Sequence, residues 1–176
     1  MKKQKTPLPG LLEIIPKIFT DARGYFMETY RQNAFEEIGV PRNFVQDNQS
    51  GSFKGVLRGL HFQIKKPQAK LVRVISGKVF DVAVDLRPGS DTYGKWHGVT
   101  LCSQLKNMLY IPEGFAHGFL TLSDTAELSY KCSDFYDPGD EGGILWNDPF
   151  IGIKWPDTGI APILSEKDLT YSPIHE

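Results

Sequence analysis

The sequence predicts an all-β fold, a sandwich or barrel with a few short helices, and two observations support this. Strand-like segments dominate the 176 residues: 78–87 and 125–132 both alternate apolar and polar side chains with period two. Turn-rich breaks separate such runs, among them 87–91, 103–107 and 137–140. Short strands at this spacing are typical of an all-β sandwich or barrel.

The two strand predictions also assign side chains to faces. In the first strand one face is apolar and the other polar, with Phe80, Val82, Val84 and Leu86 on the first and Asp81 and Asp85 on the second. Ser76-Gly77 is interpreted as a hairpin turn that follows a strand over 71–75. In the second strand Tyr130 shares a face with Ala126, Leu128 and Cys132 and should point inward.

Helix signals are scarce. One helix is predicted over 33–38, with Asn33 as its cap, Glu36 three residues later and Gly39 as its end. A second short turn is predicted to begin at Ser165. No repeat or linker divides the chain, and the residues after Pro156 are interpreted as a tail packed on the same domain. We therefore expect a single domain over residues 1–176.

Composition narrows the class of protein. Hydrophobic residues make up 40% of the chain, so it should fold as a globule. Twenty basic residues are balanced by 21 acidic ones, which argues against nucleic acid or an anionic membrane as a partner. Two cysteines, Cys102 and Cys132, are too few for a disulfide scaffold and fit a reducing cytosol. With no predicted signal peptide or membrane span, we expect a cytoplasmic protein.

A turn near the middle of the chain indicates the kind of barrel. Pro112-Glu113-Gly114-Phe115-Ala116-His117 has the Pro-x-Gly-x-x-His spacing of a cupin (jelly-roll) barrel, in which the turn aims a histidine into the barrel mouth. Metal-binding cupins carry His-x-His and a nearby Glu, whereas here His61 is followed by Gln63 and no carboxylate occurs over 64–69. Two histidines and an amide are a poor ligand set for a first-row metal. We expect no metal, and histidines left free for proton chemistry.

The segment around His61 offers three candidates, each with a plainer alternative. His61 is a natural general base near neutral pH, or a half-buried strand histidine bonded to the backbone. Arg58, three residues earlier, would lie on the opposite face of a straight strand unless Gly59 forms a bulge. Lys70 could stabilise an oxyanion, or could be a strand-end lysine that extends into solvent.

Three further candidates lie elsewhere in the chain. Tyr130 is protonated at neutral pH and could act as an acid, or it is a core tyrosine. Asp81 could fix the tautomer of a pocket histidine, although a surface aspartate is more common. Ser165-Glu166-Lys167-Asp168 has a capping-box pattern, so Asp168 either reaches back to the Ser165 amide or orients His61.

Taken together, these residues resemble the dTDP-4-dehydrorhamnose 3,5-epimerase family, a family of metal-free cupins. The resemblance extends from about Leu11 to Asp168. It is carried by the segments 19–26, 46–50, 58–63, 70–72, 81–87, 112–119, 130–132, 146–149 and 164–168.

The resemblance implies roles for particular residues. His61 would be the general base, Asp168 its orienting carboxylate, Lys70 the enolate stabiliser and Tyr130 the acid on the opposite face. The residues implied to surround the nucleotide sugar are Arg23, Glu28, Gln46, Asn48, Arg58, Lys70, His117, Glu141 and Lys167. The implied substrate is a dTDP-linked 4-keto-6-deoxyhexose, dTDP-4-keto-6-deoxy-D-glucose, converted to dTDP-4-keto-L-rhamnose without a cofactor. The implied unit is a homodimer, with the segment 23–28 reaching into the partner's site.

Three other functions compete with this expectation. A relative could epimerise only C3 or only C5, or isomerise the ketone, of another nucleotide 4-keto-deoxysugar. A metal-dependent cupin oxygenase would need ligands that the sequence does not supply. A non-catalytic nucleotide-sugar binding module would not need His61, Tyr130 and Asp168 together.

Overall fold

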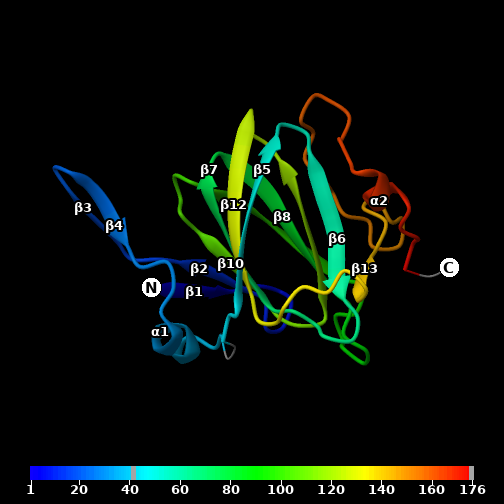
Figure 1. The fold of residues 1–176 in the computed structure, drawn as a ribbon, viewed down its shortest axis with the longest axis horizontal. Helices are drawn as coiled ribbons and strands as arrows, with labels where there is room; N and C mark the ends of the chain where they lie inside the picture. Colours follow the sequence, from blue (N-terminus) through cyan, green and yellow to red (C-terminus); the bar gives the residue numbers. More distant parts are fainter. Residues whose placement is uncertain (41–42, 175–176) are drawn as a thin grey trace.

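The computed structural model describes residues 1–40 and 43–174, and most of its strands form two facing antiparallel sheets (Figure 1). The six-stranded sheet has the order β1 (Lys2–Lys5), β2 (Leu12–Ile15), β10 (Met108–Ile111), β7 (Lys70–Ser76), β12 (Thr125–Cys132) and β5 (Gln46–Phe53). The five-stranded sheet has the order β13 (Glu141–Gly143), β6 (Leu57–Gln63), β11 (Phe115–Thr121), β8 (Lys78–Asp85) and β9 (Trp96–Cys102). A separate hairpin pairs β3 (Ile18–Asp21) with β4 (Gly24–Met27).

The core between the sheets is built from alternate residues of their central strands. Val72 of β7 and Leu128 of β12 meet Ala83 of β8 and Phe119 of β11 in one buried cluster. Side chains on the outward face of β8 are also covered, because Val82 and Val84 pack with Ile144 and Ile151 of the C-terminal third. The five-stranded sheet is therefore buried on both faces at its centre.

Both faces of β8 are therefore covered. Asp81 and Asp85 share a face as predicted, and both are fully buried on the same face as Ala83, toward the barrel interior. For Asp81 this is not the surface position that had been considered more common. Burial acts to raise the pKa of Asp85, but hydrogen bonds from Arg87, Thr92 and Ser90 hold it far below its usual range. Asp85 thus remains an anion that anchors the turn after β8.

The predicted hairpin at Ser76-Gly77 is wrong. Both edges of β7 are already paired, with β10 on one side and β12 on the other, so β8 cannot join it there. The chain instead crosses from the six-stranded to the five-stranded sheet at Gly77, which has φ +78°. A Cβ at Gly77 would lie 2.2 Å from the Thr125 carbonyl oxygen, so this tight crossing requires glycine.

The first helix, α1 (Gln32–Glu37), differs from prediction at its start. Its N-cap is Arg31 without a side-chain cap, so Asn33 is not the cap, and Asn33 Oδ1 instead accepts a hydrogen bond from Arg31. The chain leaves the helix at Gly39, with φ +95°, as predicted. Phe35 of α1 packs on the outer face of the six-stranded sheet.

The second helix, α2 (Glu166–Leu169), begins as predicted at Ser165, whose Oγ accepts a hydrogen bond of 3.1 Å from the Asp168 amide. Figure 1 places α2 beside β6 and β13, at the opposite end of the molecule from the hairpin β3–β4. Ile163, just before α2, pairs with Val56. The tail is therefore held against the strand that carries His61, which brings distant parts of the sequence together.

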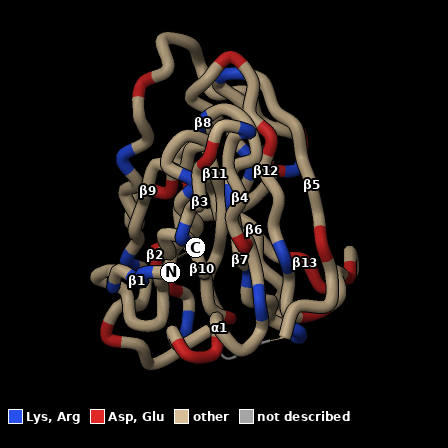
Figure 2. The backbone as a smooth tube through the Cα atoms, turned by 90° about the vertical axis from the view of Figure 1, so that its left-hand side faces the viewer, with Lys and Arg blue, Asp and Glu red and all other residues tan. Residues whose placement is uncertain are grey.

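Charges of both signs are interspersed along the chain in the view of Figure 2, in keeping with the balanced composition. Across residues 1–40 and 43–174, no helix has the length and apolar character needed to span a bilayer. Two facing antiparallel sheets with short helices at their margins form a jelly-roll barrel of the cupin kind, the predicted fold class.

Candidate active site

A cavity of about 520 Å³ opens between the two sheets. One wall comes from β6, β11 and β13, the other from β5, β7 and β12, and the segment 163–168 closes one side. Ten of the twelve residues predicted for the site line this cavity: Gln46, Asn48, Arg58, His61, Lys70, His117, Tyr130, Glu141, Lys167 and Asp168.

A bulge in β6 lets Arg58 and His61, which are three residues apart and would lie on opposite faces of a straight strand, reach the same cavity. In the pairing with β11, His117 lies opposite His61 and Phe119 opposite Arg58, so three steps along β6 match two along β11. Gly59, within the bulge, has φ +121°, and a Cβ there would lie 2.5 Å from Gly118 Cα. The bulge suggested by Gly59 is therefore present, and Arg58 and His61 both line the pocket.

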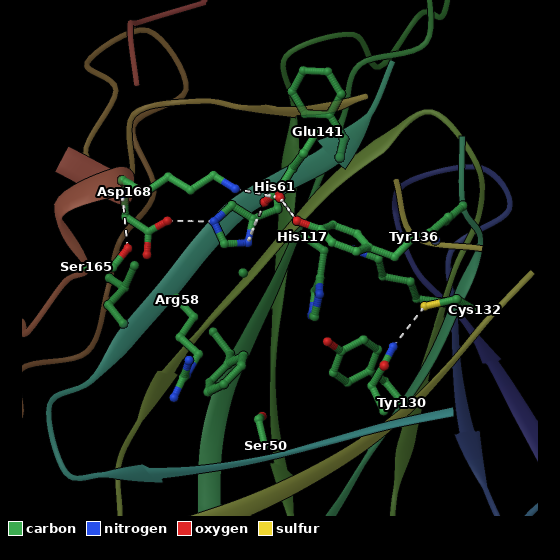
Figure 3. A pocket seen from close by; sticks show the side chains of 18 of the residues that line it. Ser50, Arg58, His61, His117, Tyr130, Cys132, Tyr136, Glu141, Ser165 and Asp168 are labelled. Atoms are coloured by element: carbon green, nitrogen blue, oxygen red, sulfur yellow. Dashed lines mark hydrogen bonds and ion pairs between the residues drawn. The ribbon is translucent and has the colours of Figure 1, made fainter. Parts of the chain in front are cut away.

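His61 is held by a carboxylate from α2. Its Nε2 lies 2.5 Å from Asp168 Oδ1, and the Asp168 side chain is 3% exposed (Figure 3). Burial acts to raise the pKa of Asp168, but hydrogen bonds involving His61, Ser165 and the Gly59 amide hold it below its usual range. An ionised carboxylate can only accept, so Nε2 carries the hydrogen and Nδ1 keeps a lone pair. Of the two alternatives for the Asp168 side chain, the contact with His61 is the one observed.

His117 is fixed in a similar way from within the barrel. Its Nε2 lies 2.9 Å from Asp81 Oδ1 and 3.0 Å from Oδ2, and both residues are buried. The predicted contact of Asp81 with a pocket histidine is thus present, although a surface position had been considered more common. The carboxylate sets the tautomer of His117 just as Asp168 sets that of His61.

The opposite wall carries a tyrosine and a lysine. Tyr130 of β12 faces His61 across the cavity in Figure 3. Burial raises the pKa of the Tyr130 phenol, which keeps its proton available. Lys70, the first residue of β7, lies opposite Cys132 in register, and burial lowers the pKa of its ammonium group. Lys70 lines the cavity instead of extending into solvent.

The rim on the β13 side is an ion-pair cluster. Glu141 Oε2 lies 2.5 Å from Lys167 Nζ and accepts a hydrogen bond of 2.5 Å from the Tyr136 hydroxyl. Burial acts to raise the pKa of Glu141, while these two partners lower it below the usual range. Tyr136 was not predicted from the sequence, because it lies between the strand ending at Cys132 and the turn-rich break 137–140, where no strand or helix pattern marks it.

Strand β5 contributes a row of polar side chains. Gln46 Nε2 donates to Asn48 Oδ1 at 3.0 Å, and Asn48 Nδ2 lies 3.6 Å from Cys132 Sγ. Ser50 continues the row into the cavity and was not predicted. Its position two residues after Asn48, on the same strand face, was the signal that could have identified it.

Two predicted site residues lie elsewhere in this chain. Arg23, with a side chain 90% exposed, is at the turn of the hairpin β3–β4 and pairs with Asp21 at 2.6 Å. Glu28 pairs with Arg31 at 3.0 Å and does not line the cavity. Figure 1 shows the hairpin projecting away from the body of the molecule. Within one chain, Arg23 and Glu28 are therefore not part of the pocket.

Metal-ligating side chains do not gather at this site. Of the residues that the structure describes, no group of three or more His, Cys, Asp or Glu is placed to hold a metal ion. His61 and His117, which a metal cupin would use as ligands, each direct a nitrogen to a carboxylate instead.

A histidine–carboxylate pair on one wall of a cupin barrel and a buried tyrosine on the other are groups of the kind that acid–base enzymes use. A family model described as dTDP-4-dehydrorhamnose 3,5-epimerase matches residues 5–176. The chain belongs to this family, and it is therefore an epimerase, an enzyme of the isomerase class.

Individual relatives agree with the family match. A dTDP-4-dehydrorhamnose 3,5-epimerase of Methanothermobacter thermautotrophicus is 56% identical over 173 residues, which cover 98% of this chain and 94% of the relative. One of Salmonella typhimurium is 56% identical over 166 residues, covering 93% and 90%. The crystal structure of a dTDP-6-deoxy-D-glucose-3,5-epimerase of Legionella pneumophila, in complex with dTDP-4-keto-L-rhamnose, superposes with a TM-score of 0.95 at 47% identity. That match covers 98% of this chain and 92% of the other.

Proposed function

We propose that the pocket converts dTDP-4-keto-6-deoxy-D-glucose to dTDP-4-keto-L-rhamnose, with His61 as base and Tyr130 as acid. The observation that supports these roles most directly is the placement of the His61–Asp168 pair on one wall and a buried tyrosine on the other. An epimerase needs both, because the proton must leave on one face of the sugar and return on the opposite face.

The substrate chemistry accounts for each group. The C3 and C5 hydrogens flank the C4 ketone, so breaking either C–H bond moves its electron pair into an enolate whose charge collects on the C4 oxygen. Catalysis then requires a base at the carbon, a positive charge near the oxygen and an acid across the ring. The proposed reaction transfers protons and no hydride, so it calls for no nicotinamide.

The described geometry suits His61 to the first step. Because Asp168 holds the hydrogen on Nε2, the proton from carbon is taken by the lone pair of Nδ1. The resulting imidazolium stays paired with the Asp168 carboxylate, whose pKa is held low enough to keep it anionic. Asp168 thus orients the base and stabilises its charged form.

Lys70 is suited to the enolate and Tyr130 to the return of the proton. Burial lowers the pKa of the Lys70 ammonium, and a nearby negative oxygen would favour its charged form, so Lys70 interacts more strongly with the enolate than with the ketone. The buried Tyr130 phenol gives its proton to the carbon from the side opposite His61. Before the next proton abstraction, His61 releases the proton it took to solvent and the Tyr130 phenolate takes up a proton from solvent.

The remaining pocket residues bind the nucleotide sugar. Its diphosphate requires local cations, since the chain as a whole is nearly neutral, and Arg58 and Lys167 provide them within the cavity. The other polar side chains proposed to contact the substrate are Gln46, Asn48, His117 and Glu141. We also propose a cytoplasmic location, because both cysteines, Cys102 and Cys132, are free.

Whether both carbons react is tested by solvent exchange. The enzyme is incubated in heavy water with dTDP-4-keto-6-deoxy-D-glucose, and deuterium is measured separately at C3 and C5 by NMR. We expect uptake at both positions together with formation of dTDP-4-keto-L-rhamnose. Uptake at one carbon alone would indicate a single-carbon epimerase, and transfer of the ketone to another carbon would indicate a ketoisomerase.

We further propose a homodimer in which the hairpin β3–β4 completes the partner's site. The hairpin carries exposed aromatic side chains, with Phe19 50%, Tyr25 58% and Phe26 69% exposed, a cost that burial against a second copy would offset. Arg23 at its turn would then add a cation to a site that is not its own chain's.

Subunit complementation tests this arrangement. Arg23→Ala and His61→Asn should each lower activity as homodimers. When the two variants are co-expressed, some dimers should contain one chain of each kind. In such a mixed dimer, one site combines the intact His61 of one chain with the intact Arg23 of the other, and the second site lacks both. Activity should then rise to about a quarter of the parent, the fraction expected for random pairing with one restored site per mixed dimer. A mixture no more active than its components would place Arg23 outside the shared site.

A further inference from the structure

The His61 ring is approached by two carboxylates, of which only one directly holds it. Asp168 contacts Nε2, while Glu141 Oε1 lies 3.9 Å from Nδ1, the atom proposed to take the proton (Figure 3). Other groups also face the ring. Tyr171 of the C-terminal tail contacts it edge-on at a centroid distance of 5.8 Å, and His117 lies opposite it in register on β11.

Glu141 is firmly held in place. It belongs to β13, which pairs with β6 so that Gly143 lies opposite His61. The preceding residue, Asp140, is buried and accepts hydrogen bonds of 2.8 to 3.0 Å from the backbone amides of Lys65 and Lys66. The side chain of Glu141 is only 9% exposed. A carboxylate this restrained acts on its neighbour as a fixed charge.

The charge of Glu141 is partly offset by a cation. Its second oxygen, Oε2, contacts Lys167 Nζ and the Tyr136 hydroxyl, each at 2.5 Å. Oε1 is the oxygen directed toward His61. The imidazole therefore experiences a carboxylate whose field is diminished by an ammonium group on its far side.

We propose that Glu141 is a positioning residue that acts through His61, and that the Glu141–Lys167 pair sets how firmly His61 holds the proton it removes from the sugar. The inference rests on the proposed role of His61 as base and goes beyond a substrate contact for Glu141. When the C–H bond breaks and the proton arrives at Nδ1, the imidazolium lies between two anions, Asp168 at Nε2 and Glu141 near Nδ1. Glu141 favours this charged form and Lys167 opposes it.

Two charge variants should have effects of opposite sign. The titration of the His61 ring is followed by NMR in the free enzyme, with its resonance assigned among the four histidines by its absence in His61→Asn. In Glu141→Gln the midpoint should move to lower pH by on the order of one unit, because an anion at about 4 Å is lost. In Lys167→Met it should move to higher pH, because the offsetting cation is lost. The acid limb of kcat/KM should move in the same directions.

Tyr136→Phe is the matched control, since it removes a neutral hydrogen bond from the same carboxylate oxygen without changing any charge. Its midpoint should stay close to that of the parent. A midpoint unchanged in Glu141→Gln would overturn the inference, as would shifts of the same sign in both charge variants, which indicate general disturbance of the pocket. Normal epimerisation by His61→Asn would instead refute the proposed role of His61 as base. The titration of the His61 ring in the charge variants would still show whether Glu141 and Lys167 affect it.

Discussion

His61→Asn and His61→Ala should abolish both epimerisation and solvent exchange while the fold stays intact. The base removes the proton in the first step, so nothing downstream proceeds without it. The expected loss in kcat is on the order of 10²–10⁴. Asparagine keeps a polar side chain near Asp168, whereas alanine leaves that buried carboxylate without its partner. A loss of activity in both variants is therefore due to the missing base and not to the unpaired carboxylate. Deuterium uptake at C3 and C5 measures the effect, and the thermal midpoint reports folding.

The matched control is His97→Asn. His97 lies on β9 and does not line the cavity, so its loss should leave the rate within about twofold of the parent, as is usual for substitutions away from the reacting groups. Near-normal turnover by either His61 variant would remove His61 from the mechanism. A comparable loss in His97→Asn would mean that the measurement reports stability instead of chemistry.

Asp168→Asn extends the same prediction to the partner of the base. The amide can donate to Nε2, which would move the hydrogen to Nδ1 and leave the reacting nitrogen without a lone pair. Exchange should therefore fall although His61 is still present. The Ser165 cap uses the backbone amide of residue 168, so the start of α2 should be preserved in this variant.

Period-two patterns predicted which residues share a strand face, but not which face is interior. Tyr130 was expected inward with Ala126 and Leu128, and that is where it lies. On β8 the same reasoning put Asp81 and Asp85 on one polar face and left open whether Asp81 contacts a pocket histidine or lies at the surface, because a polar face next to an apolar one normally faces water. Here Ile144 and Ile151 of the C-terminal third cover the apolar face, and the barrel encloses the polar one. The alternation can be read within the strand itself, whereas the residues that cover it come from a distant part of the sequence.

The glycines Gly59 and Gly77 correctly marked where the backbone departs from regular strand geometry, but the sequence did not show which strands the chain connects there. Gly59 indicated a bulge, and the bulge is what brings Arg58 and His61 into one cavity. Gly77 indicated a tight turn, but a positive φ suits a crossing between sheets as well as a hairpin, and the pairing of β7 on both edges decides between them. No strand or helix pattern in the sequence placed Arg23, which lies at the exposed turn of the hairpin β3–β4 and pairs with Asp21.

Tyr130→Phe should separate exchange from epimerisation. Without the phenol, His61 can still remove a proton and return it to the same face. Solvent deuterium should then enter the substrate with its original configuration retained, while formation of the epimer falls sharply. The ring keeps its packing beside Leu128, so the free energy of unfolding should change by about 1 kcal/mol or less. NMR resolves the two processes, because retained and inverted products differ in their ring-proton couplings.

Two other tyrosine variants show whether this behaviour is specific. Tyr30→Phe, on the outer face of the six-stranded sheet, should change neither process. Tyr136→Phe should keep epimerising, because the Tyr136 hydroxyl is already committed to Glu141 at the rim. If Tyr136→Phe instead gave exchange with retention and Tyr130→Phe did not, the acid would be Tyr136. If exchange and epimerisation fell together in Tyr130→Phe, its hydroxyl would serve the enolate or the bound sugar, since only the loss of the final proton donor leaves exchange intact.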